Sequence, residues 1–162
     1  MNVKKHFLYG NQDWITPYPL IDGLGGAESF DLDPCAAEIQ PWSTAKTHYT
    51  VKENGLKQPW SGSVFLSPPW GSITTAWINK AIEHGNVTAL LPSRTDTKLF
   101  HDLVLPNTYG LFLLRGRIRY HDTKGRIHGS STSPSILVAF GTESAERLEK
   151  CSLDGFYIRL KK

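Results

Sequence analysis

Residues 62–85 read GSVFLSPPWGSITTAWINKAIEHG, and the pattern of this stretch predicts a strand, a turn and a helix. The apolar run within residues 62–66 is typical of a buried strand. Beyond the two prolines, apolar residues recur at helical spacing until Gly85, a residue type that commonly ends a helix. We therefore expect a buried strand over residues 62–66 and a helix over about residues 72–84, with Ser72 as its N-cap.

The turn between these two elements is Ser67-Pro68-Pro69-Trp70. Its two prolines fix two φ angles and remove two backbone donors, so the turn offers carbonyl groups without competing N–H groups. A small polar side chain precedes them and a large flat ring follows. This combination suits a site that holds a planar base against the ring and accepts hydrogen bonds from its exocyclic amine. Two plainer interpretations stay open: a surface turn that closes the strand, and a Trp70 ring that belongs to the core.

Strand and helix patterns alternate along the rest of the chain. We expect helices over residues 19–24, 97–104 and 143–150, and strands over 29–33, 87–91, 109–114, 117–121, 135–140 and 155–160. Residues 1–13 look like a loosely packed lead-in, 38–61 like an irregular segment and 121–133 like a mobile loop. The strands over 109–114 and 117–121 are expected to pair antiparallel about Gly116. This order predicts a single α/β domain over residues 1–162, with a sheet that is parallel at its centre and antiparallel late in the chain.

In such sheets, ligands bind beyond the carboxyl ends of the strands. Three polar loops follow predicted strands in this way: Asp33-Pro34-Cys35, residues 67–70, and residues 93–96. We expect these loops to converge on one cleft.

Composition places the chain among ordinary globular proteins. It has 162 residues, 40% hydrophobic and 20% charged, with a formal net charge of +3. The start carries no apolar segment of signal-peptide length and no run approaches a membrane span, so we expect a cytoplasmic protein. The two cysteines, Cys35 and Cys151, are far apart, and the six histidines show no ligand spacing. These patterns predict buried thiols and no metal site.

Three arginines, Arg115, Arg117 and Arg119, alternate along the segment predicted as a strand. Alternation on a strand would place all three on one face, where they could follow the phosphates of a nucleic acid. An edge strand that carries charge against aggregation is the other interpretation.

Taken in order along the chain, the three polar loops and the segments around them resemble the small Dam-like DNA N-6-adenine methyltransferases of phages and prophages. The resemblance covers most of the chain and is carried by residues 13–17 (DWITP), 30–36 (FDLDPCA), 54–56 (NGL), 65–71 (FLSPPWG), Trp77, Lys80-Ala81, 91–97 (LPSRTDT), Phe100-His101, 114–118 (LRGRI) and 133–135 (SPS). It implies a Rossmann-like methyltransferase fold, a mixed sheet with helices on both faces. It also implies transfer of a methyl group from S-adenosylmethionine to N6 of adenine in DNA, by a monomer or homodimer in a bacterial cytoplasm, in a phage or restriction-modification setting.

The resemblance also implies where the ligands bind. The candidate cofactor residues are Trp14, Thr16, Pro17, Asp31, Asp33, Pro34, Cys35 and Asn54. Catalysis is assigned to Ser67, Pro68, Pro69 and Trp70: the Ser67 oxygen and the Pro68 carbonyl accept hydrogen bonds from the target amine, and Trp70 stacks on the base. The candidate DNA contacts are Arg94, Lys98, Arg115, Arg117 and Arg119, and residues 38–61 and 121–133 are candidates for base reading.

This chain departs from the family pattern at three places. The loop after the first strand has Ala36 and Ala37 where such enzymes usually carry a glycine-rich loop, Asn54 stands where an acidic residue is common, and Ser67 stands where Asp or Asn is usual. Ser-Pro-Pro-aromatic is commoner in cytosine-N4 enzymes, so cytosine-N4 methylation stays an alternative.

Other interpretations need only part of these residues. A non-catalytic DNA-binding protein would need the arginines without the cofactor pocket, and a metal-dependent nuclease would need Asp31, Asp33 and Asp96 around magnesium. Asp31 and Asp33 also suit a role as turn caps, and Asp96 suits the cap of the helix from residue 97.

Overall fold

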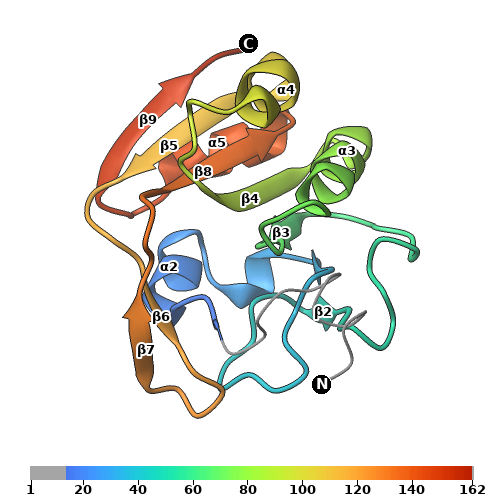
Figure 1. Ribbon diagram of the computed structural model, residues 1–162, viewed down its shortest axis with the longest axis vertical. Coiled ribbons are helices and arrows are strands. Elements are labelled where there is room, and N and C mark those ends of the chain that lie inside the picture. The colour runs from blue at the N-terminus through green and yellow to red at the C-terminus, as the bar shows by residue number, and fades with distance from the viewer. Residues whose placement is uncertain (1–13, 162) are drawn as a thin grey trace.

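The computed structural model describes residues 14–161, and its centre is one seven-stranded sheet (Figure 1). The expected lead-in at residues 1–13 lies outside the described residues. The strands of the sheet are β1 (Leu32–Asp33), β2 (Thr47–His48), β3 (Val64–Leu66), β4 (Val87–Pro92), β5 (Gly110–Leu114), β8 (Ser135–Phe140) and β9 (Gly155–Arg159). Their order across the sheet is β2-β1-β3-β4-β8-β5-β9.

The first four strands in this order run parallel, whereas β8 is antiparallel to both β4 and β5, and β9 is antiparallel to β5. The predicted change from parallel to antiparallel pairing is therefore confirmed. It follows that the carboxyl ends of β1, β3, β4 and β5 lie at one edge of the sheet, together with the start of β8. We call this edge the carboxyl edge.

Helices cover both faces of the sheet, because the strand side chains alternate between two apolar clusters. Val64 and Leu66 belong to one cluster with Trp77 from α3 (Thr74–His84), whereas Phe65 belongs to the other with Leu148 from α5 (Thr142–Lys150). The remaining helical segments are α2 (Tyr18–Gly23), η1 (Ala27–Ser29), η2 (Leu99–Val104) and α4 (Leu105–Asn107). The three central strands β3, β4 and β8 are buried almost throughout, which explains their continuous apolar sequences.

Several expected elements differ in extent. The strand predicted over residues 29–33 shortens to β1, since residues 27–29 form the single turn of η1. The segment predicted as irregular contains the short strand β2. Ser72 does not cap α3; the Thr74 hydroxyl instead accepts a hydrogen bond from the N–H of Gly71 at 2.8 Å.

The largest correction concerns the strand expected over residues 117–121. The chain turns away at Gly116, whose φ is 79°, and β6 (Arg119–His121) pairs with β7 (Ile127–Ser130) in a separate two-stranded sheet. Strand β5 pairs with β8 and β9 instead, because its apolar residues are buried where neighbours on both sides satisfy its backbone. Figure 1 shows this hairpin apart from β5, β8 and β9. The expected mobile loop over residues 121–133 is therefore wrong in part, since it contains β7.

No helix within residues 14–161 is long and apolar enough to cross a membrane.

Candidate active site

The Ser67-Pro68-Pro69-Trp70 turn follows β3 at the carboxyl edge, and Thr74 holds it in place. The Thr74 side chain is buried and its hydroxyl donates to the carbonyl of Pro69 at 3.0 Å. The same oxygen accepts the N–H of Gly71, so one hydroxyl joins the turn to the first residues of α3. The two prolines are themselves buried, which leaves the turn little freedom.

Two acceptors of this turn have no hydrogen-bond partner among the described residues: the Ser67 hydroxyl and the carbonyl of Pro68. Next to them, the Trp70 side chain is 43% exposed and contacts no other ring of residues 14–161. The interpretation of Trp70 as a core residue is therefore wrong. An exposed indole beside two uncommitted acceptors is an arrangement that can receive a flat ring carrying an N–H₂ group.

The loop after β1 is built around the buried carboxylate of Asp33. One oxygen accepts the backbone N–H of Cys35 at 2.9 Å, which is the turn-capping role foreseen for this residue, and the other accepts the Thr44 hydroxyl. Burial raises the pKa of Asp33, although these two hydrogen bonds oppose the shift. Burial, with the nearby Asp33 charge, also raises the pKa of the Cys35 thiol well above its usual range, so this thiol is a poor nucleophile.

Asn54 and Gly55 lie directly against that loop. A Cβ added to Gly55 would overlap the carbonyl oxygen of Pro34, so only glycine permits this approach. Asn54 has a positive φ of 58°, and its Oδ1 is buried without a hydrogen-bond partner among residues 14–161. The structure thus brings together Pro34 and Asn54, two of the predicted cofactor residues, and leaves one of them with an unused acceptor.

The segment that carries Asn54 is fastened to α3. Lys80 donates to the carbonyls of Leu56 at 2.7 Å and Gln58 at 2.6 Å, and its ammonium lies 5.3 Å from the Trp60 ring centre. Burial lowers the pKa of Lys80. This anchoring makes the position of Asn54 depend on the same helix that holds the Pro-Pro turn.

Residues 14–17 reach the same region through Trp42. The indole N–H of Trp42 donates to the carbonyl of Thr16 at 2.9 Å, and Trp42 stands two residues before Thr44, the partner of Asp33. Trp14 is 38% exposed, and its ring lies edge-on to Tyr120 at 5.3 Å. Residues 14–17 are therefore linked to the loop after β1, and Pro17 serves as the residue that precedes α2.

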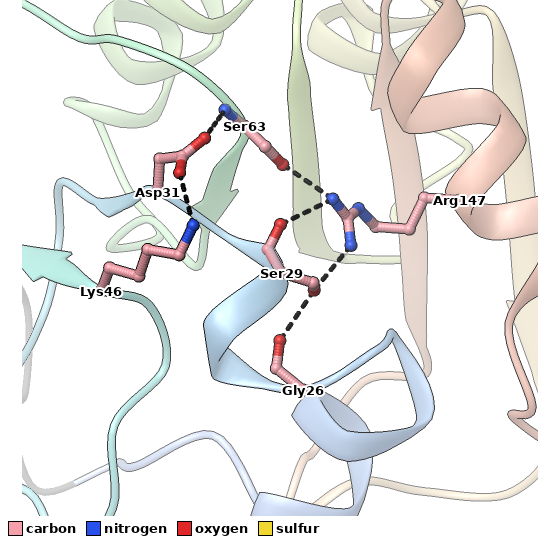
Figure 2. Close-up of polar contacts among 6 residues, drawn as sticks. All are labelled: Gly26, Ser29, Asp31, Lys46, Ser63 and Arg147. Carbon is pink, nitrogen blue, oxygen red and sulfur yellow. Dashed lines mark hydrogen bonds and ion pairs between the residues drawn. The ribbon is translucent and has the colours of Figure 1, made fainter.

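Asp31 lies elsewhere, at the opposite edge of the sheet. Figure 2 shows its carboxylate between the backbone N–H of Ser63, at 2.9 Å, and the ammonium of Lys46, at 3.0 Å. These contacts, the Ser63 N–H first, lower the pKa of Asp31. Arg147 from α5 donates to Ser29 and Ser63 in the same network, so this group ties the starts of β1 and β3 together. The structure therefore separates Asp31 from Asp33.

The candidate DNA contacts all follow strands at the carboxyl edge and are exposed. Arg94 and Lys98 follow β4, with Arg94 3.4 Å from Asp96, and Arg115, Arg117 and Arg119 follow β5. The expectation that the last three share one face of one strand is wrong, because the chain bends at Gly116 and only Arg119 is in a strand.

The partners of these arginines also differ. Arg115 pairs with Asp154 at 3.2 Å, and both side chains are largely exposed. Arg117 donates to the carbonyls of Ser131 and Thr132, at 3.3 and 2.7 Å. Arg119 makes no ion pair among residues 14–161.

A comparison with protein families matches residues 6–153 to the family described as DNA N-6-adenine-methyltransferase (Dam). The chain belongs to the Dam family. The Dam family methylates N6 of adenine in DNA, so this chain is a DNA adenine-N6 methyltransferase, and the cytosine-N4 and non-catalytic alternatives are not favoured. Comparisons with curated proteins and with solved structures gave no match.

The Dam-family chain does not bring the three aspartates of the nuclease alternative together. Asp31 and Asp33 face different partners, and Asp96 pairs with Arg94. Residues 14–161 contain no group of three or more side chains suited to hold a metal ion. Asp96 does not cap the following helix either: the Thr97 hydroxyl accepts the N–H of Phe100 at 3.3 Å.

Sequence reasoning missed three residues that shape this Dam-family site: Thr44, Gly55 and Thr74. Gly55 enters the sequence analysis only as part of the NGL motif. The pattern that could have singled it out is the Asn-Gly pair inside an irregular segment, since such pairs mark turns. Thr74 stands at the start of α3, a place where a hydroxyl commonly bonds to the backbone. Thr44 gave no signal, since its partner Asp33 comes from another loop.

Proposed function

We propose that this Dam-family enzyme takes its methyl group from S-adenosylmethionine, bound between the loop after β1, Asn54 and residues 14–17. The buried Oδ1 of Asn54, which has no partner in the described part of the chain, supports this placement, because a buried acceptor without a donor costs free energy until a ligand supplies one. An amino or hydroxyl group of the donor would supply it. When bound, S-adenosylmethionine supplies an electrophilic methyl group attached to a positively charged sulfur.

Within this site, Asp33 acts on the loop and not on the ligand. Both of its carboxylate oxygens are engaged by Cys35 and Thr44, so it shapes the backbone that Pro34 and Cys35 present. Asp31 holds the far ends of β1 and β3. We therefore infer that Asn54, Pro34, Cys35 and residues 14–17 line the donor site, with Asp33 as a positioning residue.

The target amine is received by Ser67 and Pro68. Their two free acceptors would bond to the two N–H groups of adenine N6, which favours a pyramidal nitrogen and localises its lone pair for attack. Trp70 would stack on the base once it has left the duplex. Transfer would form the bond from nitrogen to the methyl group and break the bond from that methyl to sulfur, and the methylated nitrogen would then release one proton to solvent. The single observation that carries this proposal is that Thr74 satisfies the Pro69 carbonyl while the Ser67 and Pro68 oxygens stay free beside an exposed indole.

The strand order also supports a division of the edge into two halves. The loop after β1 lies to one side of β3, and the loops after β4 and β5 lie to the other. The donor would bind on the first side, and DNA would contact Arg94, Lys98, Arg115, Arg117 and Arg119 on the second. The target base would enter between them, at Ser67 and Trp70.

The experiment is methyl transfer from labelled S-adenosylmethionine to unmethylated DNA, followed by digestion to nucleosides. We expect label in N6-methyladenine and saturable donor binding by calorimetry without DNA. Asn54→Ala is expected to weaken donor binding, while Lys57→Ala, an exposed neighbour, is the control. Label in N4-methylcytosine would overturn the assignment of Ser67 and Pro68 to adenine, and absence of donor binding would overturn the donor site.

A further inference from the structure

The connection between β5 and β8 is much longer than their pairing requires. These strands are antiparallel neighbours, with Leu113 opposite Ile136, so a tight turn would be enough to join them. Instead, residues 115–134 leave the sheet, form the β6–β7 hairpin and return. We call residues 115–134 the ribbon segment. Its length must serve something other than closure of the sheet.

At Arg119 and Tyr120 the two faces of the hairpin differ, and beyond them a β-bulge between Tyr120 and His121 interrupts the alternation of side chains. Tyr120 points inward: its ring lies 5.3 Å from the Trp14 ring, it packs against the core cluster that contains Phe112, and burial raises its pKa. Arg119 and Ser130 are directly opposite each other in the register, and both are exposed. Side chains of directly opposed residues share a face, so this pair lies on the outer face. Ile127, next to the turn, is 61% exposed.

The ribbon segment is strongly basic. It contains a single acidic residue, Asp122, against five cations, Arg115, Arg117, Arg119, Lys124 and Arg126. Asp122 is used within the turn, where it accepts the N–H groups of Lys124 and Arg126 and pairs with the Arg126 guanidinium at 2.7 Å. The turn is thereby held in one shape, and the excess of positive charge remains for an external anion.

The ribbon segment is also joined to the carboxyl edge at both ends. It begins directly after β5, and the carbonyl of Pro134 at its end accepts the N–H of Ser93 at 2.7 Å. Ser93 stands beside Arg94, in the loop after β4. The hairpin is therefore a basic, two-stranded extension of the edge on which the target base is proposed to enter.

We propose that the β6–β7 hairpin lies in the major groove of duplex DNA beside the target adenine, and that Arg119, Ile127 and Ser130 contact the flanking base pairs. The major groove admits a two-stranded ribbon, and base edges there can be read by a guanidinium, a hydroxyl or an apolar side chain. This inference rests on the proposed function, since it needs the base to enter at Ser67 and Trp70.

The test compares Arg119→Ala, Ser130→Ala and Ile127→Ala with two matched controls. Phe156→Ala removes an apolar side chain of similar exposure, 68%, from β9, and Lys150→Ala removes an exposed cation from α5. Duplex binding is measured by fluorescence anisotropy without a methyl donor. Flanking preference is measured by methylating a duplex library with randomised neighbours of one adenine and sequencing the methylated positions.

We expect Arg119→Ala to weaken duplex binding about tenfold, and Ile127→Ala and Ser130→Ala to flatten the flanking preference, because each good base contact discriminates by about 1–3 kcal/mol. The two controls, Phe156→Ala and Lys150→Ala, should bind duplex DNA as tightly as the parent protein and keep its flanking preference. Unchanged duplex binding and unchanged flanking preference would overturn the inference, as would a parent protein without flanking preference. Failure of the proposed function has a different signature: loss of donor binding or transfer in the parent protein, with duplex binding intact.

Discussion

Gly55 and Pro34 are in direct contact: there is no room for a Cβ between the Gly55 backbone and the carbonyl oxygen of Pro34. This contact joins the loop after β1 to the segment that holds Asn54, two parts of the chain that the proposed donor site needs together.

Gly55→Ala is expected to weaken binding of S-adenosylmethionine about tenfold or more, since a forced methyl group in a tight contact costs about 1–3 kcal/mol and here moves Asn54. Gly110→Ala is the matched control. Its added methyl would meet the Tyr157 hydroxyl at the far side of the sheet, so it should lower the melting temperature without changing donor affinity. Calorimetric titration measures the affinity of both variants for S-adenosylmethionine. Equal affinity in the two would contradict the prediction.

Ser67→Ala is expected to lower kcat for methyl transfer about ten- to a hundredfold with donor affinity unchanged, because one preorganised acceptor is lost from the amine. Ser67→Asp should retain or raise kcat, as a carboxylate is a stronger acceptor. Ser72→Ala, an exposed serine five residues on, should behave as the parent protein. Single-turnover kinetics with saturating DNA measure this step, and a Ser67→Ala enzyme with the parental rate would exclude Ser67 from catalysis.

Trp70→Ala is expected to raise KM for DNA about tenfold or more, since stacking of a base on an aromatic ring contributes about 1–3 kcal/mol. Trp70→Phe should restore most of the affinity, because a smaller ring still stacks. The free energy of unfolding should barely change in either variant, as this side chain is 43% exposed. A large loss of stability in Trp70→Ala would show that the ring supports the fold instead.

Arg147→Ala is expected to destabilise the protein by about 2–4 kcal/mol, because the guanidinium satisfies the carbonyls of Leu24 and Ser29 and the hydroxyls of Ser29 and Ser63. Its guanidinium also lies 4.2 Å from the Phe30 ring centre. Lys150→Ala, on the same helix, should change stability by less than about 0.5 kcal/mol. Urea denaturation measures the free energy of unfolding of both variants. Similar values for the two variants would show that the Arg147 network adds little.

Asp122→Asn tests the pH dependence of the ribbon turn. The N–H of Arg126, with its guanidinium, lowers the pKa of Asp122 from 3.8 to about 2. A carboxyl whose pKa is lower in the folded protein stabilises it above the unfolded value and loses this contribution as the pH falls toward about 2. Asp122→Asn should therefore flatten the loss of stability between about pH 4 and pH 2. The midpoint of urea unfolding, measured for both proteins at several pH values, gives this dependence. The same change of midpoint with pH in the variant and in the parent protein would contradict the prediction.

Much of this architecture was predictable from local sequence patterns. The strand-turn-helix unit of residues 62–85 appears as expected, because its strand is apolar throughout and its helix ends at Gly85 with a φ of 75°. The α/β order then implied that loops after β1, β3 and β4 would share one edge, and the parallel pairing of these strands places them there.

Other features depended on contacts between distant segments. The partner of β6 is β7 and not β5, a choice made by burial of β5 between β8 and β9, which no local pattern reports. Asp31 and Asp33 are two residues apart, yet β1 is so short that they lie at its two ends with separate partners.

The amino-acid sequence alone determined the local elements, the family resemblance and the chemical types at the candidate site, because periodicity and backbone restriction act over a few residues. Only the tertiary structure decided which polar groups form hydrogen bonds within the protein and which remain free to bind a ligand. Thr74 occupies the Pro69 carbonyl, and Cys35 and Thr44 occupy Asp33, whereas Ser67 stays available. The physical reason is that a hydrogen bond depends on the distance between two groups in space, and that distance is set by the packing of helices and strands.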